Sequence, residues 1–282
     1  MPFVKVQFHP AEREYLFLAE FSEDNHNVFN LGDWVMAETT LGQDLALITW
    51  QGAEKPKDFL TEEVKPLLRS AKTEEIKTRK EQKQKVAQYL KDCEEACQKK
   101  DLKMKLVDAH ESLDGTRLTF YFISENRVDF RDLVRDLISK FHKKIRLQQI
   151  GVRDEAKICG DYGPCGLPLC CKNWLKSLGN VNAEYIKDQD LMHRGNERLS
   201  GICGRLKCCL RYEEEAYKYG LDKLPEVGDE IKTKAGLGRV TAVHPLKQTV
   251  DLKIDGSIVE YPYLEGKLCQ KEPGSCDGCL SN

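Results

Sequence analysis

The fold is decided largely by residues 104–150, which read MKLVDAHESLDGTRLTFYFISENRVDFRDLVRDLISKFHKKIRLQQI. Apolar residues alternate in three short runs of this stretch, as they do in β-strands, and the Asp114-Gly115 pair predicts a turn between the first two. Between the second and third runs, apolar residues recur at the helical interval, and Asp129 stands where a helix cap is expected. The pattern therefore predicts strands over 104–110, 118–123 and 145–150 and a helix over 129–142.

Working outward, residues 62–100 are rich in Lys, Glu, Gln and Ala and contain no Gly. From 73 to 99 the pattern predicts one long exposed helix with a thin apolar stripe. Cys93 and Cys97 lie one helical turn apart on that stripe, so we interpret them as packing residues and not as ligands. Together with the strands that follow, residues 61–153 are predicted to form a ferredoxin-like α+β core.

Two regions of short alternating strands flank this core. Residues 1–60 predict a small N-terminal β module, and residues 222–270 predict a C-terminal SH3-like β-barrel, followed by a tail over 271–282. The pair Gly32-Asp33 in the first module resembles Gly228-Asp229 in the second, and each is followed nine residues later by a Leu-Gly pair. The match is short, so a duplication of the module stays an open alternative. The fold class predicted for the whole chain is α+β.

A cysteine-rich segment, residues 154–215, contains a duplicated motif. The first copy, residues 163–171, reads GPCGLPLCC, and the second copy, residues 201–209, reads GICGRLKCC. Five of the nine positions are identical, and all three cysteines recur at an interval of 38 residues. The segment has few long apolar runs, so a bound metal would help to stabilise it.

Thiolates bind zinc or iron–sulfur clusters, and adjacent cysteines are poor disulfide partners because the bridge geometry would be strained. The predicted metal and cofactor ligands are Cys165, Cys170, Cys171, Cys203, Cys208 and Cys209. The spacing differs from the Cys-x-x-Cys knuckle of zinc sites. Six thiols would make one closed four-ligand site or two incomplete sites finished by a partner. The alternative without a metal is that several are small buried apolar residues.

Further cysteines and basic residues surround this motif. Cys159 precedes the first copy, and Cys269, Cys276 and Cys279 form a group with partial knuckle spacing near the C-terminus, so these four are secondary candidates for a metal. Residues 140–211 carry a formal charge of +7 in a chain whose net charge is −2. This excess predicts an anionic cluster, nucleic acid or acidic partner there. The basic residues of that predicted surface are Arg153, Lys157, Lys172, Arg205, Lys207 and Arg211.

Other classes of protein are disfavoured. The sequence contains no P-loop, no Gly-x-Gly-x-x-Gly and no nucleophile elbow, so we do not expect an enzyme. The six histidines are scattered, and we interpret them as surface or packing residues. No apolar run approaches the roughly 20 residues of a membrane helix, and the N-terminus lacks the pattern of a signal peptide. We therefore expect a cytoplasmic protein without membrane insertion.

Four stretches of the chain resemble the PSP1 domain of the YaaT/RicT family. They are residues 148–157, the first copy of the motif, residues 187–190 and residues 200–213. The resemblance extends from about residue 4 to residue 213 and is most specific from 102 onward. The C-terminal β module matches the family less closely, and Cys159 and the group near the C-terminus depart from the family pattern.

The resemblance implies a bacterial regulatory adaptor of sporulation, competence and biofilm pathways. Members of this family form a complex with small helical proteins of the YlbF and YmcA type, and the complex carries [4Fe–4S] clusters and assists RNase Y in mRNA processing. The six cysteines of the two copies would be the cluster ligands, with zinc as the second choice. A hetero-oligomer is expected. The alternative function is a zinc- or cluster-containing protein that binds RNA or DNA directly through the basic segment and aromatic residues such as Trp174 and Tyr212.

Overall fold

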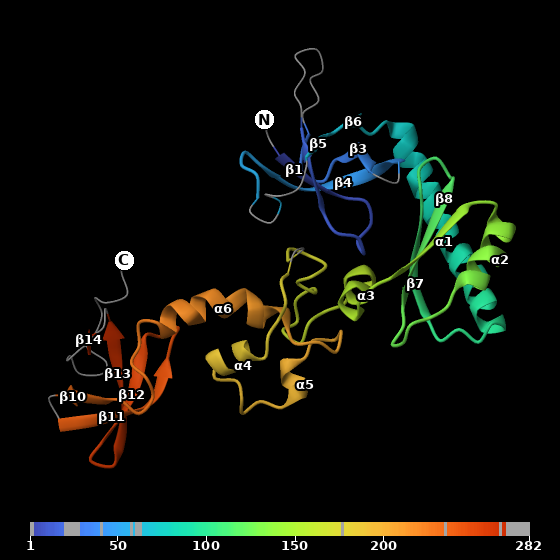
Figure 1. Cartoon of the computed structure of the whole chain (residues 1–282). Coiled ribbons are helices and arrows are strands. Elements are labelled where there is room, and N and C mark those ends of the chain that lie inside the picture. Colours follow the sequence, from blue (N-terminus) through green and yellow to red (C-terminus); the bar gives the residue numbers. More distant parts are fainter. Residues whose placement is uncertain are drawn as a thin grey trace. The chain divides into compact units, whose positions relative to one another are not determined.

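The computed structural model describes residues 3–19, 29–39, 42–56, 59, 64–175, 178–233, 236–264 and 267–268. These residues form a mixed α+β protein with three β-sheets, which agrees with the predicted class. The chain divides into two compact units, Met1–Tyr162 and Gly163–Asn282. Figure 1 shows the elements of both, and each unit is described by itself below.

Unit 1 begins with a sheet whose strand order is β5-β2-β1-β4-β3-β6. Alternate residues are buried along its strand β1, because successive side chains of a strand point to opposite faces of the sheet. The strands are β1 (Phe3–Gln7), β2 (Tyr15–Leu18), β3 (Trp34–Thr39), β4 (Gly42–Gly52), β5 (Lys65–Pro66) and β6 (Arg69–Ser70). Val4, Val6, Val35 and Ile48 are almost fully buried in the centre of its core.

The long helix α1 (Thr73–Lys99) occupies the predicted range. Its first turn is held by Glu75, whose carboxylate accepts a hydrogen bond from the backbone N of Lys72 at 2.8 Å. Hydrogen bonds from Arg69 lower the pKa of Glu75 to about 2, so this acid is charged near neutral pH and complements the positive helix end. Cys93 and Cys97 are buried in the core that α1 shares with the strands that follow it, which confirms their interpretation as packing residues.

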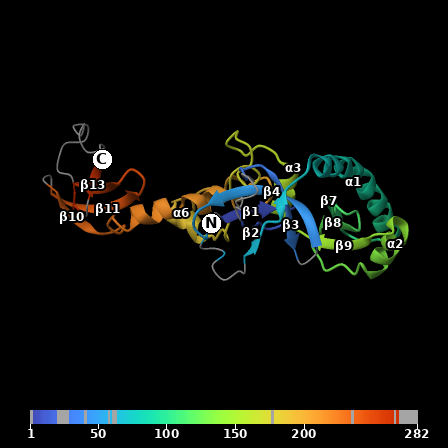
Figure 2. The same cartoon turned by 90° about the horizontal axis from the view of Figure 1, so that it is seen from above.

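Two further helices and a second sheet complete unit 1. The sheet has the order β7-β8-β9, with β7 (Lys105–Glu111), β8 (Arg117–Ile123) and β9 (Lys144–Gln149). Helix α2 (Arg131–Phe141) crosses from β8 to β9, and α3 (Val152–Cys159) follows β9. Figures 1 and 2 show α1 and α2 beside this sheet, and Leu118, Phe120 and Phe122 of β8 share one core with both helices.

Two details of this core differ from the sequence analysis. The ferredoxin-like description is not confirmed, because β8 and β9 are direct parallel neighbours, whereas a ferredoxin-like β-α-β unit is split by another strand. Asp129 is also not the cap of α2, since that position is Phe130. The Asp129 carboxylate instead accepts a hydrogen bond from the backbone N of Arg131 at 3.2 Å and pairs with its guanidinium.

Unit 2 begins at Gly163, within the cysteine-rich segment, and three described helices follow there. These are α4 (Glu184–Asp188), α5 (Asn196–Leu199) and α6 (Cys208–Leu221). A small core of Ile186, Leu199 and Leu210 joins them. The Gln189 side chain donates a hydrogen bond to the carbonyl of Leu210 at 2.7 Å, which fixes α4 against α6.

The third sheet forms the C-terminal part of unit 2, in the order β10-β11-β12-β13-β14. Its strands are β10 (Glu230–Thr233), β11 (Gly236–His244), β12 (Thr249–Ile254), β13 (Ser257–Leu264) and β14 (Lys267–Leu268). Consecutive strands pair as an antiparallel meander, and the pairings of the described strands do not close the sheet, so the predicted barrel is not confirmed. The predicted tail over 271–282 lies outside the described residues.

The two Gly-Asp turns have the same hydrogen bonds. The backbone N of Asn30 bonds the carboxylate of Asp33 at 2.8 Å, and the backbone N of Glu226 bonds that of Asp229 at 3.0 Å. In the first turn, the N–H of Gly32 donates to the carbonyl of Ile48, and the N–H of Ile48 donates to the carbonyl of Asp33. In the turn of the third sheet, Gly228, Val240 and Asp229 form the same two hydrogen bonds. The strand orders of the two sheets nevertheless differ, so the likeness is limited to this hairpin.

The described helices include none that is both long enough and apolar enough to span a membrane.

Candidate metal centre

The first copy of the motif, residues 163–171, begins with a tight turn around Cys165. The backbone N of Gly163 donates to the carbonyl of Leu167 at 2.8 Å, and the N of Gly166 donates to the carbonyl of Gly163 at 2.9 Å. Gly166 has a φ of +79°, which favours glycine. A Cβ on Gly163 would lie 3.3 Å from Sγ of Cys165, so glycine lets this sulfur approach the backbone.

The second copy, residues 201–209, forms the same turn around Cys203. The backbone N of Gly201 donates to the carbonyl of Arg205 at 2.8 Å, and the N of Gly204 donates to the carbonyl of Gly201 at 2.9 Å. Gly204 has a φ of +73°. The glycines that the two copies share are therefore explained by backbone geometry, and the sequence repeat is also a structural repeat.

Each turn leads into a helical turn that carries the Cys-Cys pair. In the first copy, the carbonyl of Leu169 accepts hydrogen bonds from the N of Lys172 and of Asn173. In the second copy, α6 begins at Cys208 itself. Backbone N–H groups at the start of a helix favour negative charge, and Cys208 and Cys209 lie at such a start.

The six thiols differ in exposure. Cys165 and Cys209 are exposed, while Cys170, Cys203 and Cys208 are half-buried and Cys171 is buried. Burial raises the pKa of Cys209, and Glu213 and Cys170 add to this effect. Cys170 of the first copy is therefore close enough to Cys209 of the second copy to affect its charge. A metal ion that binds such a thiol displaces its proton, although the pKa of the thiol is raised.

An aromatic pair joins the two copies. Trp174 follows Cys171 by three residues, and Tyr212 follows Cys209 by three, so the interval of 38 residues extends to this position. The two rings are in edge-to-face contact with centroids 4.6 Å apart. They are 52% and 60% exposed, respectively, although aromatic rings of this size are usually more buried. The copies thus pack against each other through equivalent residues.

The donor types fit a soft metal, but the described thiols do not form a closed site. Among the residues that the structure describes, no three His, Cys, Asp or Glu side chains gather closely enough to hold a metal ion. Glycine turns that expose backbone N–H groups to sulfur, and thiols at helix starts, are features of thiolate metal centres.

The predicted basic surface is divided between the units. Arg153 and Lys157 belong to α3 of unit 1, whereas Lys172, Arg205, Lys207 and Arg211 belong to unit 2. The Arg211 guanidinium bonds the carboxylate of Glu214 at 2.8 Å and lies over the ring of Tyr185. Arg211 therefore stabilises the packing of α6, while Lys172 and Arg205 are exposed.

The structure describes one of the four secondary cysteine candidates. Cys159 is exposed at the end of α3 in unit 1. Cys269, Cys276 and Cys279 lie outside the described residues. Whether these four bind a metal stays a prediction.

Sequence reasoning missed a polar cluster inside unit 1. His9 bonds Asp108 at 3.1 Å, and His110 bonds the buried carboxylate of Asp44 at 3.0 Å. The histidines had been interpreted as isolated surface or packing residues. The sequence contained a weak signal of this cluster, because Asp108 and His110 are two residues apart and therefore lie on the same face of their strand. Their partners, however, are far away in the sequence.

The architecture and the duplicated turn define an α+β protein with a repeated cysteine-containing turn. The PSP1 C-terminal conserved region matches residues 65–150, and the third domain of PSP1-like proteins matches residues 180–224. The chain is 32% identical over 264 residues to the stage 0 sporulation protein YaaT of Bacillus subtilis, covering 93% of this chain and 94% of that protein. The chain therefore belongs to the PSP1/YaaT family.

A more distant similarity connects the chain to an uncharacterized protein of Schizosaccharomyces pombe. The identity is 27% over 167 residues, which is 46% of this chain and 22% of that protein. No solved structure matches the chain.

Proposed function

We propose that this protein is a cytoplasmic regulatory adaptor whose two cysteine turns supply thiolate ligands to iron–sulfur clusters completed by partner proteins. The observation that carries the proposal is the shared geometry of residues 163–171 and 201–209, including the same two backbone hydrogen bonds in each turn. Two equal turns, each with fewer thiols than a closed site needs, favour a centre shared between chains. When bound, a cluster would link the chains through its iron–thiolate bonds.

The residues of this chain would position the cluster and offset its charge. Cys165, Cys170, Cys171, Cys203, Cys208 and Cys209 would provide the ligands, and the exposed Lys172 and Arg205 would balance the negative thiolates. The family membership supports partners of the YlbF and YmcA type and a role in RNase Y-dependent mRNA processing in sporulation-type pathways. An adaptor, and not an enzyme, is the proposed role.

The test of the cluster is anaerobic purification of the full chain with its partners, followed by visible absorbance and analysis of iron, sulfide and zinc. We expect iron and sulfide, and we expect Cys170→Ser and Cys208→Ser each to reduce the iron content by more than about half, because a lost thiolate opens the site. Cys97→Ala is the matched control, since Cys97 is buried in the core of unit 1. Stoichiometric zinc in a colourless protein would contradict the cluster, and unchanged iron in both Ser variants would contradict the ligand set.

A second candidate function, direct binding of RNA, is favoured by the exposed aromatic pair Trp174 and Tyr212 beside Lys172. Bases of single-stranded RNA stack on such rings, and alanine substitution typically costs about 1–3 kcal/mol per base. We expect Trp174→Ala to weaken the binding of a fluorescent single-stranded RNA about tenfold or more, measured by anisotropy at low and moderate salt. Tyr219→Ala removes another exposed ring of α6 and is the control. Binding that is undetectable, or equal in the two variants, would reject this candidate.

A further inference from the structure

Unit 1 contains a cavity of about 290 Å³ that the metal centre does not use. Side chains of the first sheet line one side of it, and side chains of the β7-β8-β9 sheet line the other. His110, Thr119 and Arg146 belong to the second side and are neighbours in the strand pairings, so they form one row across that sheet. The volume is near the lower end of the roughly 300–1,000 Å³ of small-molecule sites.

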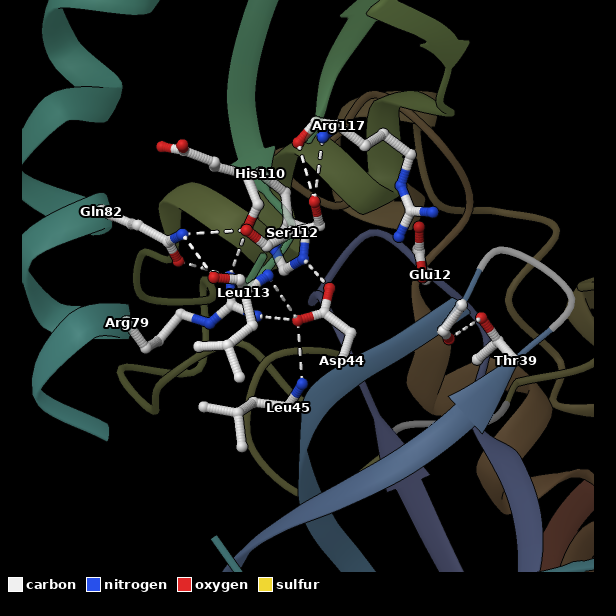
Figure 3. Close-up of polar contacts among 12 residues, drawn as sticks. Glu12, Thr39, Asp44, Leu45, Arg79, Gln82, His110, Ser112, Leu113 and Arg117 are labelled. Atoms are coloured by element: carbon white, nitrogen blue, oxygen red, sulfur yellow. Dashed lines mark hydrogen bonds and ion pairs between the residues drawn. The ribbon is translucent and has the colours of Figure 1, made fainter. Parts of the chain in front are cut away.

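The floor of the cavity is polar and hydrogen-bonded. The carboxylate of Asp44, which is 3% exposed, bonds His110, the guanidinium of Arg79 and the backbone N of Leu45. Burial alone would raise the pKa of Asp44, but the hydrogen bond from His110 and the charge of Arg79 outweigh it and lower the pKa. Figure 3 shows these groups converging on Asp44. The negative charge of Asp44 is therefore balanced within the floor.

A second acid of the cavity, Glu12, also has a hydrogen-bond partner. The carboxylate of Glu12 accepts a hydrogen bond from the hydroxyl of Tyr121 at 2.9 Å. In Figure 3 the guanidinium of Arg117 and the carboxylate of Glu12 point toward each other. Both residues line the cavity, so their formal charges cancel in its total.

The remaining charges at the cavity are mainly positive. Lys65 and Arg146 are exposed residues that line it, and within the described part of the chain neither is held in an ion pair. Arg13 lies over the ring of Tyr15 at 4.9 Å. Glu38 is the remaining acid of the lining. The cavity therefore has an excess of positive charge, which attracts anions.

Aromatic side chains form the apolar part of the wall. Phe8 and Tyr15 are in edge-to-face contact with centroids 5.6 Å apart, and Phe17 lines the same side. A ligand that fills the cavity thus needs a negatively charged head for the cations and a flat apolar body for the rings.

We propose that this cavity binds a small phosphate ester with a planar body, of the size and chemistry of a nucleoside monophosphate. Lys65 and Arg146 bind the phosphate, and the ring of Tyr15 contacts the base. The site is independent of the thiols, because all of its residues belong to unit 1, whereas both copies of the cysteine motif belong to unit 2.

The test is calorimetric titration of the full-length protein with AMP, UMP, inorganic phosphate and adenosine. We expect AMP or UMP to bind, and inorganic phosphate and adenosine to bind at least about tenfold more weakly, since each lacks one half of the ligand. Arg146→Gln and Lys65→Gln should each weaken nucleotide binding about tenfold. Arg135→Gln is the matched control, because it removes an exposed arginine of α2 that does not line the cavity.

Three results would overturn the proposal. They are the absence of heat with both nucleotides, equal binding of adenosine and AMP, and wild-type affinity in the Arg146→Gln and Lys65→Gln variants. The circular dichroism of each variant checks that it is folded. Because all these residues are outside the cysteine turns, a negative result leaves the metal measurement unaffected, and the two proposals fail separately.

Discussion

Replacing Asp44 by Asn should lower the free energy of unfolding of unit 1 by about 3–5 kcal/mol, because it leaves Arg79, whose side chain is only 13% exposed, without its counter-charge. Asp44 is on β4, Arg79 is on α1 and His110 is on β7, so one carboxylate joins three elements of the unit. Asp44 also accepts hydrogen bonds from the backbone N of Leu45 at 2.8 Å and of Leu113 at 3.2 Å. Asparagine keeps the shape of the side chain but not its charge.

Hydrogen exchange read by mass spectrometry measures this effect in the full chain, because peptides of unit 1 and unit 2 are distinguished. The loss should appear in β4, α1 and β7 together and not in α6. Asp132→Asn is the control, since Asp132 is an exposed acid of α2 with one exposed ion pair, for which a change below about 0.5 kcal/mol is expected. Equal protection in the Asp44 variant and the wild type would show that the buried pair does not stabilise the unit.

Acidification should destabilise unit 1 in two steps. Burial lowers the pKa of His9 below its usual value of 6.5, although Asp108 opposes this, so the neutral imidazole is the folded form. The unfolded chain therefore takes up this proton first, and stability is lost as the pH falls from about 6.5 toward the folded pKa. Each such proton lowers the free energy of unfolding by up to about 1.4 kcal/mol per pH unit.

The second step comes from Asp44 and Asp108. The pKa of each is lowered in the folded protein because hydrogen bonds from histidine outweigh the effect of burial. Their stabilisation is complete above the unfolded value of about 3.8 and is lost as the pH falls through the lower folded value. Urea unfolding followed by circular dichroism from pH 7.5 to about 2 should show both steps, because the second lies below the unfolded value of about 3.8. His9→Gln should remove the first step and leave the part of the second step that comes from Asp44, because the histidine partner of Asp44 is His110. A first step of unchanged size in that variant would assign it to another group.

Local sequence patterns determined most of the secondary structure. The helical spacing before residue 100 gave α1 its bounds, because a long run without Gly leaves no point at which the helix would end early. The strands from β7 to β13 follow alternating apolar residues, which is a property of neighbours in the chain. The arrangement of the strands could not be obtained in this way, and both the ferredoxin-like core and the closed barrel were expected from analogy with known folds.

The cysteine motif was only partly predictable. Its repeat, its glycines and its soft-metal chemistry are written in residues 163–171 and 201–209, because a positive φ favours glycine in any protein. The equal hydrogen bonds of the two turns and the contact between Trp174 and Tyr212 required the structure.

The sequence by itself thus determined the elements, the family resemblance and the duplicated thiol motif, since each depends on residues that are near one another in the chain. The tertiary structure decided how the strands are ordered, and it created the polar cluster and the cavity of unit 1. His9 and Asp108 are 99 residues apart, and Asp44 and His110 are 66 apart. Such pairs form only when the sheets pack, because packing brings residues that are distant in the sequence into contact. A charge buried in this way is costly unless it has a partner.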